Sequence, residues 1–242
     1  MRDYAMETQQ RVDFIRKTLD SAGAGGLVFG NSGGKDSALV GILCKMACPD
    51  TVGLIMPCGS KRNFREDRDD AETVARQFGI ASRVIDLTPA RDALVAQMGG
   101  FDGLSRSALS NIAPRLRMTT LYAVAARENR LVAGTGNRSE AYMGYFTKWG
   151  DGACDFNPIG DLTVTEIYAF LRYLQAPPGL ISKAPSAGLF DGQTDEDEMG
   201  ITYQRLDAYL LQGVADPAAQ EVIEPAHRRS CHKRQAPRVY GG

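Results

Sequence analysis

The sequence contains no apolar run long enough to cross a bilayer, and its first residues, Met1 to Tyr4, are polar where a secretory signal would be apolar. An excess of charge of one sign is also missing, because the net charge is only -1. A chain without a basic field has no general electrostatic attraction for nucleic acid. We therefore expect a cytoplasmic protein whose partners include neither a membrane nor a nucleic acid.

The five cysteines form neither a disulfide framework nor a zinc site. Cys44 and Cys48 are one helical turn apart, but no second pair follows at the spacing of zinc ligands. An odd number of cysteines also argues against a complete set of disulfides. We interpret them as ordinary cytosolic thiols.

The chain has 242 residues, of which 43% are hydrophobic and 24% are charged, as in ordinary globular proteins. This length suits one sizeable α/β domain and is too short for two full catalytic domains. No internal repeat or low-complexity linker divides the sequence, so we expect residues 1–242 to form a single domain. The Gly-rich, acidic stretch at 187–200 predicts a mobile loop within it.

Short apolar runs alternate with amphipathic stretches along the chain. Strands are predicted at 27–29, 52–56, 83–87 and 130–133. Helices are predicted at 4–22, 36–46, 65–78, 112–129, 203–211 and 217–224, with short helices between 89 and 98 and another helix starting near 163. The alternation predicts an α/β fold with a Rossmann-like, doubly wound, mostly parallel sheet and helices on both faces. Ligands of such folds bind at the carboxyl ends of the strands.

An octet between the first predicted strand and the next helix has the composition of a phosphate-binding loop. It consists of Gly30, Asn31, Ser32, Gly33, Gly34, Lys35, Asp36 and Ser37. Glycines let the backbone approach phosphate, helix-start amides point at the anion, and Ser32 and Ser37 can donate hydroxyl hydrogen bonds. Phosphate would repel Asp36 unless a cation stood between them, so Asp36 suggests a Mg²⁺ ligand.

Two better-known phosphate motifs do not fit this octet. A Walker loop needs four residues between its glycines, whereas only three separate Gly30 from Gly34, and Asp36 stands where Ser or Thr is required. The glycine-rich run at 23–25 lacks the third glycine of a dinucleotide fingerprint and precedes the strand. An ordinary strand-to-helix turn is the structural alternative. The octet instead resembles the Ser-Gly-Gly-X-Asp-Ser loop of the ATP pyrophosphatases, which cleave ATP between the α and β phosphates.

A second polar block, at 134–155, begins where the strand at 130–133 ends. It should open on the same sheet edge as the phosphate loop, so Glu140 can supply a second carboxylate to the same Mg²⁺. The alternative for Glu140 is an ordinary acid in the first turn of a helix. The block is too rich in polar, glycine and aromatic residues to be core, and its acids are not in EF-hand order. Together with 183–187 and 232–234, it closely resembles the NAD synthetase family.

The resemblance implies the conversion of deamido-NAD to NAD. In this family ATP adenylates the nicotinate carboxylate and releases pyrophosphate, and ammonia then displaces AMP and leaves an amide. Glutamine-dependent relatives carry a nitrilase-like domain before the synthetase domain. Because the phosphate loop here begins at Gly30, the resemblance implies the ammonia-dependent form, with a separate glutaminase subunit as the alternative. Family members are homodimers, and the helix at 112–129 is either an interface element or ordinary core.

The resemblance also implies roles for particular residues. Those with a catalytic role are Asp36, Glu140 and Lys183, of which the two acids would bind Mg²⁺. Those that contact ATP are the octet Gly30–Ser37, Met56, Thr135 and Ser186. Those that contact deamido-NAD are Arg115, Lys148, Asp155, His232 and Lys233. The cations in the last group suit the phosphates of a dinucleotide, and each could otherwise be a solvated surface residue.

One position departs from the family pattern. Many members have a lysine that contacts the ATP phosphates where Val164 stands. Valine cannot replace that charge, so we hypothesise that Lys35 or Lys183 neutralises the departing pyrophosphate. The acidic stretch at 191–198 is either a lid that keeps water from the adenylate or a solvated loop.

Two other functions compete with this interpretation. A tRNA-modifying ATP pyrophosphatase would share the phosphate loop, but a net charge of -1 gives it no support, and it leaves the block at 134–155 without a role. A nucleotide-binding regulator that lost turnover would be consistent with Val164, but Asp36 and Glu140 are both retained. Formation of AMP distinguishes an enzyme from such a regulator.

Overall fold

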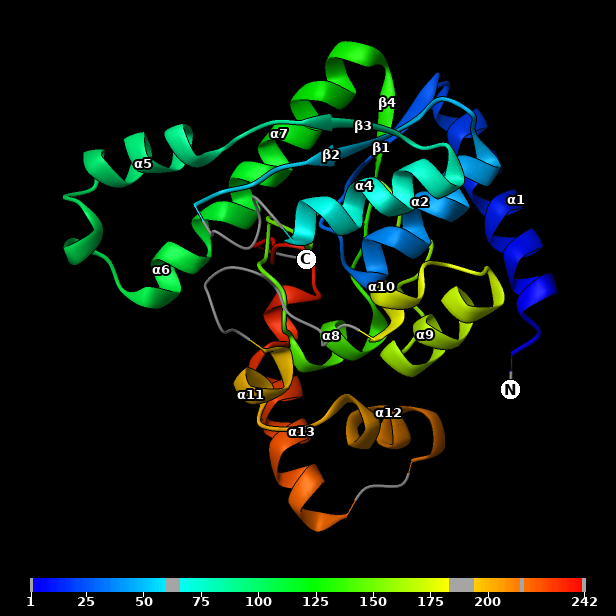
Figure 1. Ribbon diagram of the computed structural model, residues 1–242. Helices are drawn as coiled ribbons and strands as arrows, with labels where there is room; N and C mark the ends of the chain where they lie inside the picture. Colours follow the sequence, from blue (N-terminus) through cyan, green and yellow to red (C-terminus); the bar gives the residue numbers. More distant parts are fainter. Residues whose placement is uncertain (1, 60–65, 183–193, 214–215, 241–242) are drawn as a thin grey trace.

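The structure is a computed structural model, and it describes residues 2–59, 66–182, 194–213 and 216–240. Within these ranges the centre is a parallel four-stranded sheet in the order β3-β2-β1-β4 (Figure 1). Its strands are β1 (Gly26–Gly30), β2 (Thr51–Ile55), β3 (Ala81–Val84) and β4 (Arg130–Ala133). In β1, Val28 pairs with Val52 on one side and Val132 on the other. A central strand buried on both faces requires the continuous apolar run that 27–29 provides.

Helices cover both faces of the sheet, which confirms the doubly wound α/β prediction (Figure 1). The helices on one face are α1 (Tyr4–Ala22), α2 (Lys35–Ala47), α4 (Glu66–Phe78) and α9 (Val164–Tyr173). They share a core with Phe29, to which Leu43 and Phe170 also belong. On the other face, α7 (Ile112–Glu128) packs Val124 into a second core with Val132.

The strand order creates a crevice at the carboxyl ends of β1 and β4. The chain runs outward from β1 through β2 to β3 and then returns to add β4 on the opposite side of β1. Doubly wound sheets bind ligands where the strand order reverses in this way. The phosphate loop at 30–37 follows β1 and the block at 134–155 follows β4, so both motifs meet at the crevice.

The C-terminal helices form a separate packing unit beside the crevice. Helix α8 (Arg138–Met143) lies between the sheet and the C-terminal helices (Figure 1). The remaining elements are α5 (Thr88–Gln97), η1 (Phe101–Gly103), α6 (Arg106–Ser110), α10 (Pro178–Ser182), α11 (Asp195–Met199), α12 (Tyr203–Gln212), α13 (Pro217–Arg229) and η2 (Cys231–Lys233). Helices α12 and α13 pack on α8 through a third core that contains Met143, Leu206 and Ile223. No helix of the described part of the chain is long and apolar enough to span a bilayer.

Most predicted boundaries agree with the structure within two residues, but some need correction. The strand expected at 83–87 lies at 81–84. Beyond it, the amides of Ile85 and Leu87 still donate to the carbonyls of Ile55 and Pro57, both at 2.9 Å. The short helices expected between 89 and 98 are one helix, α5. Helix α13 does not end at 224 but continues through Pro225 to Arg229, where its last turns pack on α8.

The mobile loop predicted at 187–200 is wrong for its last residues. Residues 195–199 form α11, whose first turn is capped by the Thr194 hydroxyl. Asp195 is only 3% exposed, and it accepts a hydrogen bond from the Tyr203 hydroxyl at 3.1 Å. This hydrogen bond holds residues 195–199 against the protein, although their acidic composition predicts a solvated segment. Residues 187–193 lie outside the described residues, and they include the first part of the proposed lid, 191–193.

Candidate active site

The phosphate loop is fixed tightly against its neighbours. The backbone amide of Asn31 donates to the Leu54 carbonyl at 2.8 Å, and its side-chain amide donates to the Ala71 carbonyl at 3.3 Å. Gly33 has a φ of +75°, and a Cβ at this position would lie 2.1 Å from the backbone oxygen of Asp67. Since both the backbone angle and the close approach exclude a side chain, the sequence needs glycine at this turn.

Hydroxyl and amide donors gather where α2 begins. Gly34 is the N-cap residue and has no side chain to cover the first amides of the helix. Ser32 Oγ lies 3.1 Å from Ser37 Oγ and accepts from the Gly34 amide at 3.3 Å. Ser37 Oγ also donates to the Gly34 carbonyl at 3.0 Å. Such donors at a helix N-terminus suit an anion, and phosphate is the natural occupant.

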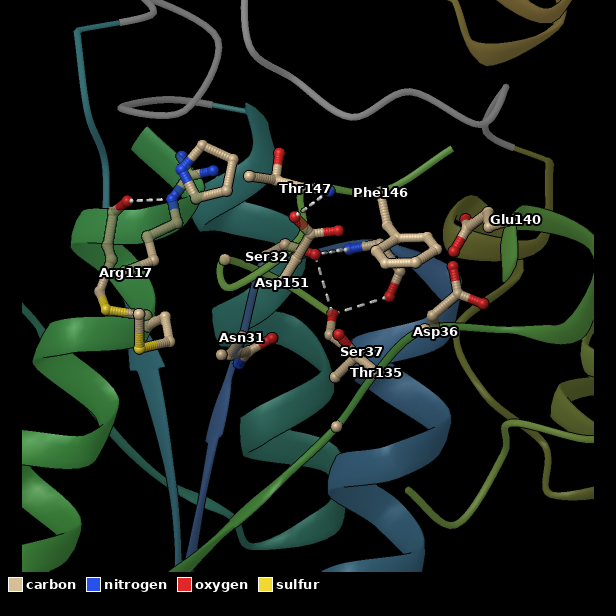
Figure 2. A pocket seen from close by; sticks show the side chains of 18 of the residues that line it. Asn31, Ser32, Asp36, Ser37, Arg117, Thr135, Glu140, Phe146, Thr147 and Asp151 are labelled. Atoms are coloured by element: carbon tan, nitrogen blue, oxygen red, sulfur yellow. Dashed lines mark hydrogen bonds between the residues drawn. The ribbon is translucent and has the colours of Figure 1, made fainter. Parts of the chain in front are cut away.

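Two carboxylates from different helices meet beside this loop. Asp36 belongs to α2 and Glu140 to α8, and their carboxyl groups point toward one another in the cavity (Figure 2). The ammonium of Lys35 lies 2.8 Å from Asp36 Oδ2 and 3.8 Å from Glu140 Oε1. The Lys35 side chain is only 6% exposed, and its ammonium lies 5.5 Å from the ring centre of Tyr203. A buried cation therefore already stands against both acids.

The charges of this group shift the pKa values of Glu140 and Lys35. Burial, together with the charge of Asp36, raises the pKa of Glu140 well above its usual value. Burial alone would lower the pKa of Lys35, but the charges of Asp36 and Glu140 outweigh it and raise that pKa. Because burial and the charge of Asp36 disfavour the ionised form of Glu140, an added cation is favoured here. Hard carboxylate oxygens fit Mg²⁺, which often binds through one or two carboxylates plus substrate phosphates. Within the described residues, no three His, Cys, Asp or Glu side chains are arranged to hold a metal ion by themselves.

Asn137 joins the two acids, although the sequence analysis does not identify it as a site residue. Its side-chain oxygen accepts from the Glu140 backbone amide at 2.9 Å, and its own backbone amide donates to Glu140 Oε2 at 3.4 Å. Its Nδ2 also donates to Asp36 Oδ1 at 3.1 Å. The available signal is the spacing Asn-x-x-Glu after a strand, which is a capping box that starts α8.

The crevice holds a cavity of about 420 Å³. Met56 and Thr135, both assigned to ATP by resemblance, line it together with the phosphate loop. Arg117 of α7 lies at the opposite end from Asp36 and Glu140 (Figure 2). The cavity thus extends from the phosphate loop, with Asp36 and Glu140 beside it, to the guanidinium of Arg117.

Arg117 and Asp151 are cavity residues that the sequence analysis does not identify. Arg117 Nε donates to the Met56 carbonyl at 3.1 Å, and burial lowers its pKa. Asp151 Oδ1 accepts from the Thr147 amide at 3.0 Å, and desolvation raises its pKa against the opposing charge of Arg117. Figure 2 places Asp151 between Arg117 and the pair of acids. Both groups face space that a polar ligand could fill.

Two lysines assigned to deamido-NAD tie the C-terminal residues to the cavity wall. Lys233 lines the cavity and donates from Nζ to the carbonyls of Gly144 and Phe146, both at 2.8 Å. Lys148 donates in the opposite direction, from its Nζ to the carbonyl of His232 at 2.5 Å. The side chain of His232 is exposed. These contacts bring Lys148, His232 and Lys233 together, and their contact with deamido-NAD stays a prediction.

Asp155, also assigned to deamido-NAD, is bound to the end of the sheet. Its carboxylate accepts from the Val132 amide at 2.7 Å and from the Tyr122 hydroxyl at 3.2 Å. Through Tyr122 it connects β4 to α7. Its carboxylate thus has a structural role at the crevice, and its contact with a ligand stays a prediction.

We expect Arg117 to bind substrate more strongly than Arg115, its neighbour two positions earlier. Arg115 is exposed and donates to the Lys148 carbonyl at 3.3 Å, whereas Arg117 lines the cavity. Because a hydrogen bond to a charged group contributes about 1.5–3 kcal/mol, Arg117→Met should raise the KM for an anionic substrate roughly 10- to 100-fold. Steady-state kinetics of Arg117→Met and Arg115→Met make the comparison. A larger effect from Arg115→Met would contradict this expectation and indicate that the substrate binds at the outer face of α7.

Val164 lies in the third core and not at the cavity. Its side chain is 2% exposed and belongs to the cluster that contains Met143 and Tyr203. Position 164 therefore supplies no positive charge, and its side chain does not line the cavity. Lys35 is in place beside both acids, whereas Lys183 and Ser186 lie outside the described residues.

Comparison with known proteins agrees with this geometry. The family model described as NAD synthase matches residues 7–237. The NH(3)-dependent NAD(+) synthetase of Carboxydothermus hydrogenoformans is 47% identical over 236 residues, which is 96% of each chain. The NMN synthetase structure from Francisella tularensis superposes with a TM-score of 0.94 at 38% identity over 100% of both chains. For the NH3-dependent NAD synthetase from Campylobacter jejuni the TM-score is 0.80 at 33% identity over 99% of both. With a match over nearly its whole length, the chain belongs to the NAD synthase family.

Proposed function

We propose that this chain is an ammonia-dependent NAD synthase that converts deamido-NAD to NAD. The observation that carries the proposal is the pair Asp36 and Glu140 beside the phosphate loop in a chain of this family. In the first step a nicotinate carboxylate oxygen attacks the α-phosphorus of ATP, a P–O bond forms, and the bond to pyrophosphate breaks. In the second step ammonia attacks the acyl carbon, a C–N bond forms, the C–O bond to AMP breaks, and ammonia loses a proton.

The residues of the site divide this work between them. The loop amides with Ser32 and Ser37 hold the phosphates. Asp36 and Glu140 would hold Mg²⁺, which stabilises negative charge on phosphate oxygens when it is bound. Lys35 belongs to the phosphate loop and lines the cavity, so its ammonium can neutralise charge on the departing pyrophosphate.

A carboxylate is available for the proton that ammonia releases. Asp151 lines the cavity between Arg117 and the two acids (Figure 2). Its carboxylate can therefore accept a proton that is released in the cavity. Arg117, at the far end, suits a phosphate of the pyridine nucleotide.

Product analysis tests the proposal directly. The protein is incubated with Mg–ATP, deamido-NAD and either ammonium or glutamine, and the nucleotides are separated. NAD, AMP and pyrophosphate formed with ammonium alone support it. AMP and pyrophosphate without NAD would indicate that a glutaminase partner supplies the nitrogen. ATP binding without any AMP would contradict the enzyme and favour a nucleotide-binding regulator.

A second candidate substrate is the mononucleotide, the deamido form of NMN. The observation in its favour is the closer superposition on the NMN synthetase of Francisella tularensis than on the NAD synthetase of Campylobacter jejuni. Both substrates carry the same nicotinate carboxylate, so the chemistry at Asp36 and Glu140 is unchanged. Competition between equimolar deamido-NAD and its mononucleotide, followed by the ratio of NAD to NMN, decides between them.

We also propose that the chain forms a homodimer through the arm of α5 and η1. Of the α7 residues considered for an interface, Val124 is buried in the second core, and Leu121 packs against that core partly buried. The arm extends away from the sheet (Figure 1) and exposes Leu94 and Met98 by 42% each and Phe101 by 49%. Several large exposed apolar side chains on one arm favour a protein interface.

The double variant Leu94→Glu/Phe101→Glu is expected to shift the dimer to a monomer. Two charges on a face that would be buried in the dimer each carry a desolvation cost of several kcal/mol. Light scattering after size exclusion measures the mass, and Leu211→Glu, at another exposed apolar position of 45% exposure, is the control. If the wild-type protein is already a monomer, the proposed homodimer is wrong.

A further inference from the structure

A buried carboxylate outside the cavity lining connects three helices behind Glu140. Asp207 of α12 is 2% exposed. Its Oδ1 accepts from the Ser139 hydroxyl at 2.5 Å, and its Oδ2 accepts from the Thr165 amide at 2.7 Å. A buried carboxylate carries a large desolvation cost, so its two satisfied oxygens indicate a specific structural purpose.

Ser139 completes the junction from the side of α8. It is fully buried, and its Oγ accepts from the Val164 amide at 3.2 Å while donating to Asp207. Ser139 and Asp207 therefore satisfy the amides of Val164 and Thr165, the first two residues of α9. The positive end of a helix dipole favours a carboxylate at this place. Helices α8, α9 and α12 thus meet at one buried hydrogen-bonded point.

The junction lies one residue from a proposed metal ligand. Ser139 directly precedes Glu140 in α8, a helix of only 6 residues. Neighbouring residues of a helix project about 100° apart, so a bond that fixes Ser139 also fixes the direction of Glu140. On the opposite side Asn137 holds Glu140 near Asp36 through its hydrogen bonds to both. Rotation of α8 about its axis would break the first contact and displace Glu140 from the second.

We propose that Asp207 is a positioning residue, which acts through Ser139 to direct Glu140 toward Asp36 and the metal they hold. The inference rests on the proposed function, because it assigns Glu140 to a divalent cation. Partners behind a metal ligand commonly change metal affinity about 10- to 100-fold when they are removed. The same loss is expected here, although Asp207 touches neither substrate nor metal.

The experiment compares Asp207→Asn and Ser139→Ala with Glu166→Gln. Glu166 is the matched control, because it caps the same helix α9 through Thr163 and pairs with Arg2 without touching Ser139. The Mg²⁺ concentration for half-maximal AMP formation and the thermal midpoint are measured for each variant. Binding of Mn²⁺ with α,β-methylene-ATP, followed by electron paramagnetic resonance, gives a readout that needs no turnover.

Asp207→Asn and Ser139→Ala are each expected to weaken Mn²⁺ binding and raise the Mg²⁺ requirement about 10-fold or more, whereas Glu166→Gln lowers only the thermal midpoint. Ser139→Ala keeps the test decisive if the Asp207 variant fails to fold. The proposal is overturned if both variants lose thermal stability and keep the wild-type Mn²⁺ affinity. A wild-type protein that binds Mn²⁺ with the ATP analogue but forms no AMP would contradict the proposed function instead, and the positioning role would still be tested by binding.

Discussion

Replacing Asp36 by asparagine is expected to lower the rate of AMP formation about 10³-fold or more, because the variant loses one of two carboxylates that would hold the metal. Asparagine has the same size and keeps an oxygen that can accept from Asn137, which now donates to Asp36 at 3.1 Å. The loop can therefore keep its shape while the charge is lost. A rate that recovers at high Mg²⁺ would show that the metal still binds, only more weakly.

The matched control for Asp36→Asn is Asp161→Asn. Asp161 also carries a charge-assisted contact, to Arg11 at 2.7 Å, but its side chain is 53% exposed and it does not line the cavity. Its loss should leave turnover within about twofold, since exposed ion pairs contribute little. AMP formation is measured over a Mg²⁺ titration for both proteins. If Asp36→Asn kept a tenth of the wild-type rate, the metal would have to bind elsewhere.

The position of the site could be predicted because it depends on the local sequence and on one topological rule. The apolar run at 27–29 and that at 130–133 predict two strands, and a polar motif follows each. In a parallel sheet the carboxyl ends of neighbouring strands share one edge, which brings Asp36 and Glu140 together before any distance is known. The structure places both beside the ammonium of Lys35.

The cavity side of α7 could not be predicted, for a geometric reason. Arg115 and Arg117 are two positions apart, and a helix turns about 200° over two residues, so only one can face the cavity. The rule that apolar residues face the core gives no help, because arginines occupy both positions. Which of them points inward depends on how α7 packs over Val28 and Val132, a long-range contact.

The junction at Asp207 was hidden for a different reason. Its partners, Ser139 and Thr165, lie far from it in the sequence, and a carboxylate in a helix is usually solvated. Asp195 is another example: it is only 3% exposed, although the acidic composition around it predicts a solvated loop. Burial of an acid depends on a donor from another segment, and single-sequence patterns do not record such pairs.

Lys35→Met is expected to lower turnover about 10²-fold while lowering the Mg²⁺ concentration that gives half-maximal rate. The first effect follows because no other described lysine lies against both Asp36 and Glu140 to neutralise the pyrophosphate. The second follows because the Lys35 ammonium competes with a divalent cation for the same two carboxylates. Opposite changes in the two quantities separate this role from general misfolding, which weakens both.

Lys45→Met on the same helix is the control for Lys35→Met, since the Lys45 ammonium donates to the Pro49 carbonyl at 2.7 Å, far from the acids along α2. The Mg²⁺ titration is repeated for Lys183→Met, the other candidate cation. If Lys35→Met turns over like the wild type and Lys183→Met does not, the charge that Val164 lacks comes from Lys183, and Lys35 serves only to hold the acids together before the metal binds. If both variants keep full turnover, neither lysine neutralises the pyrophosphate, and the bound metal with the loop amides must suffice.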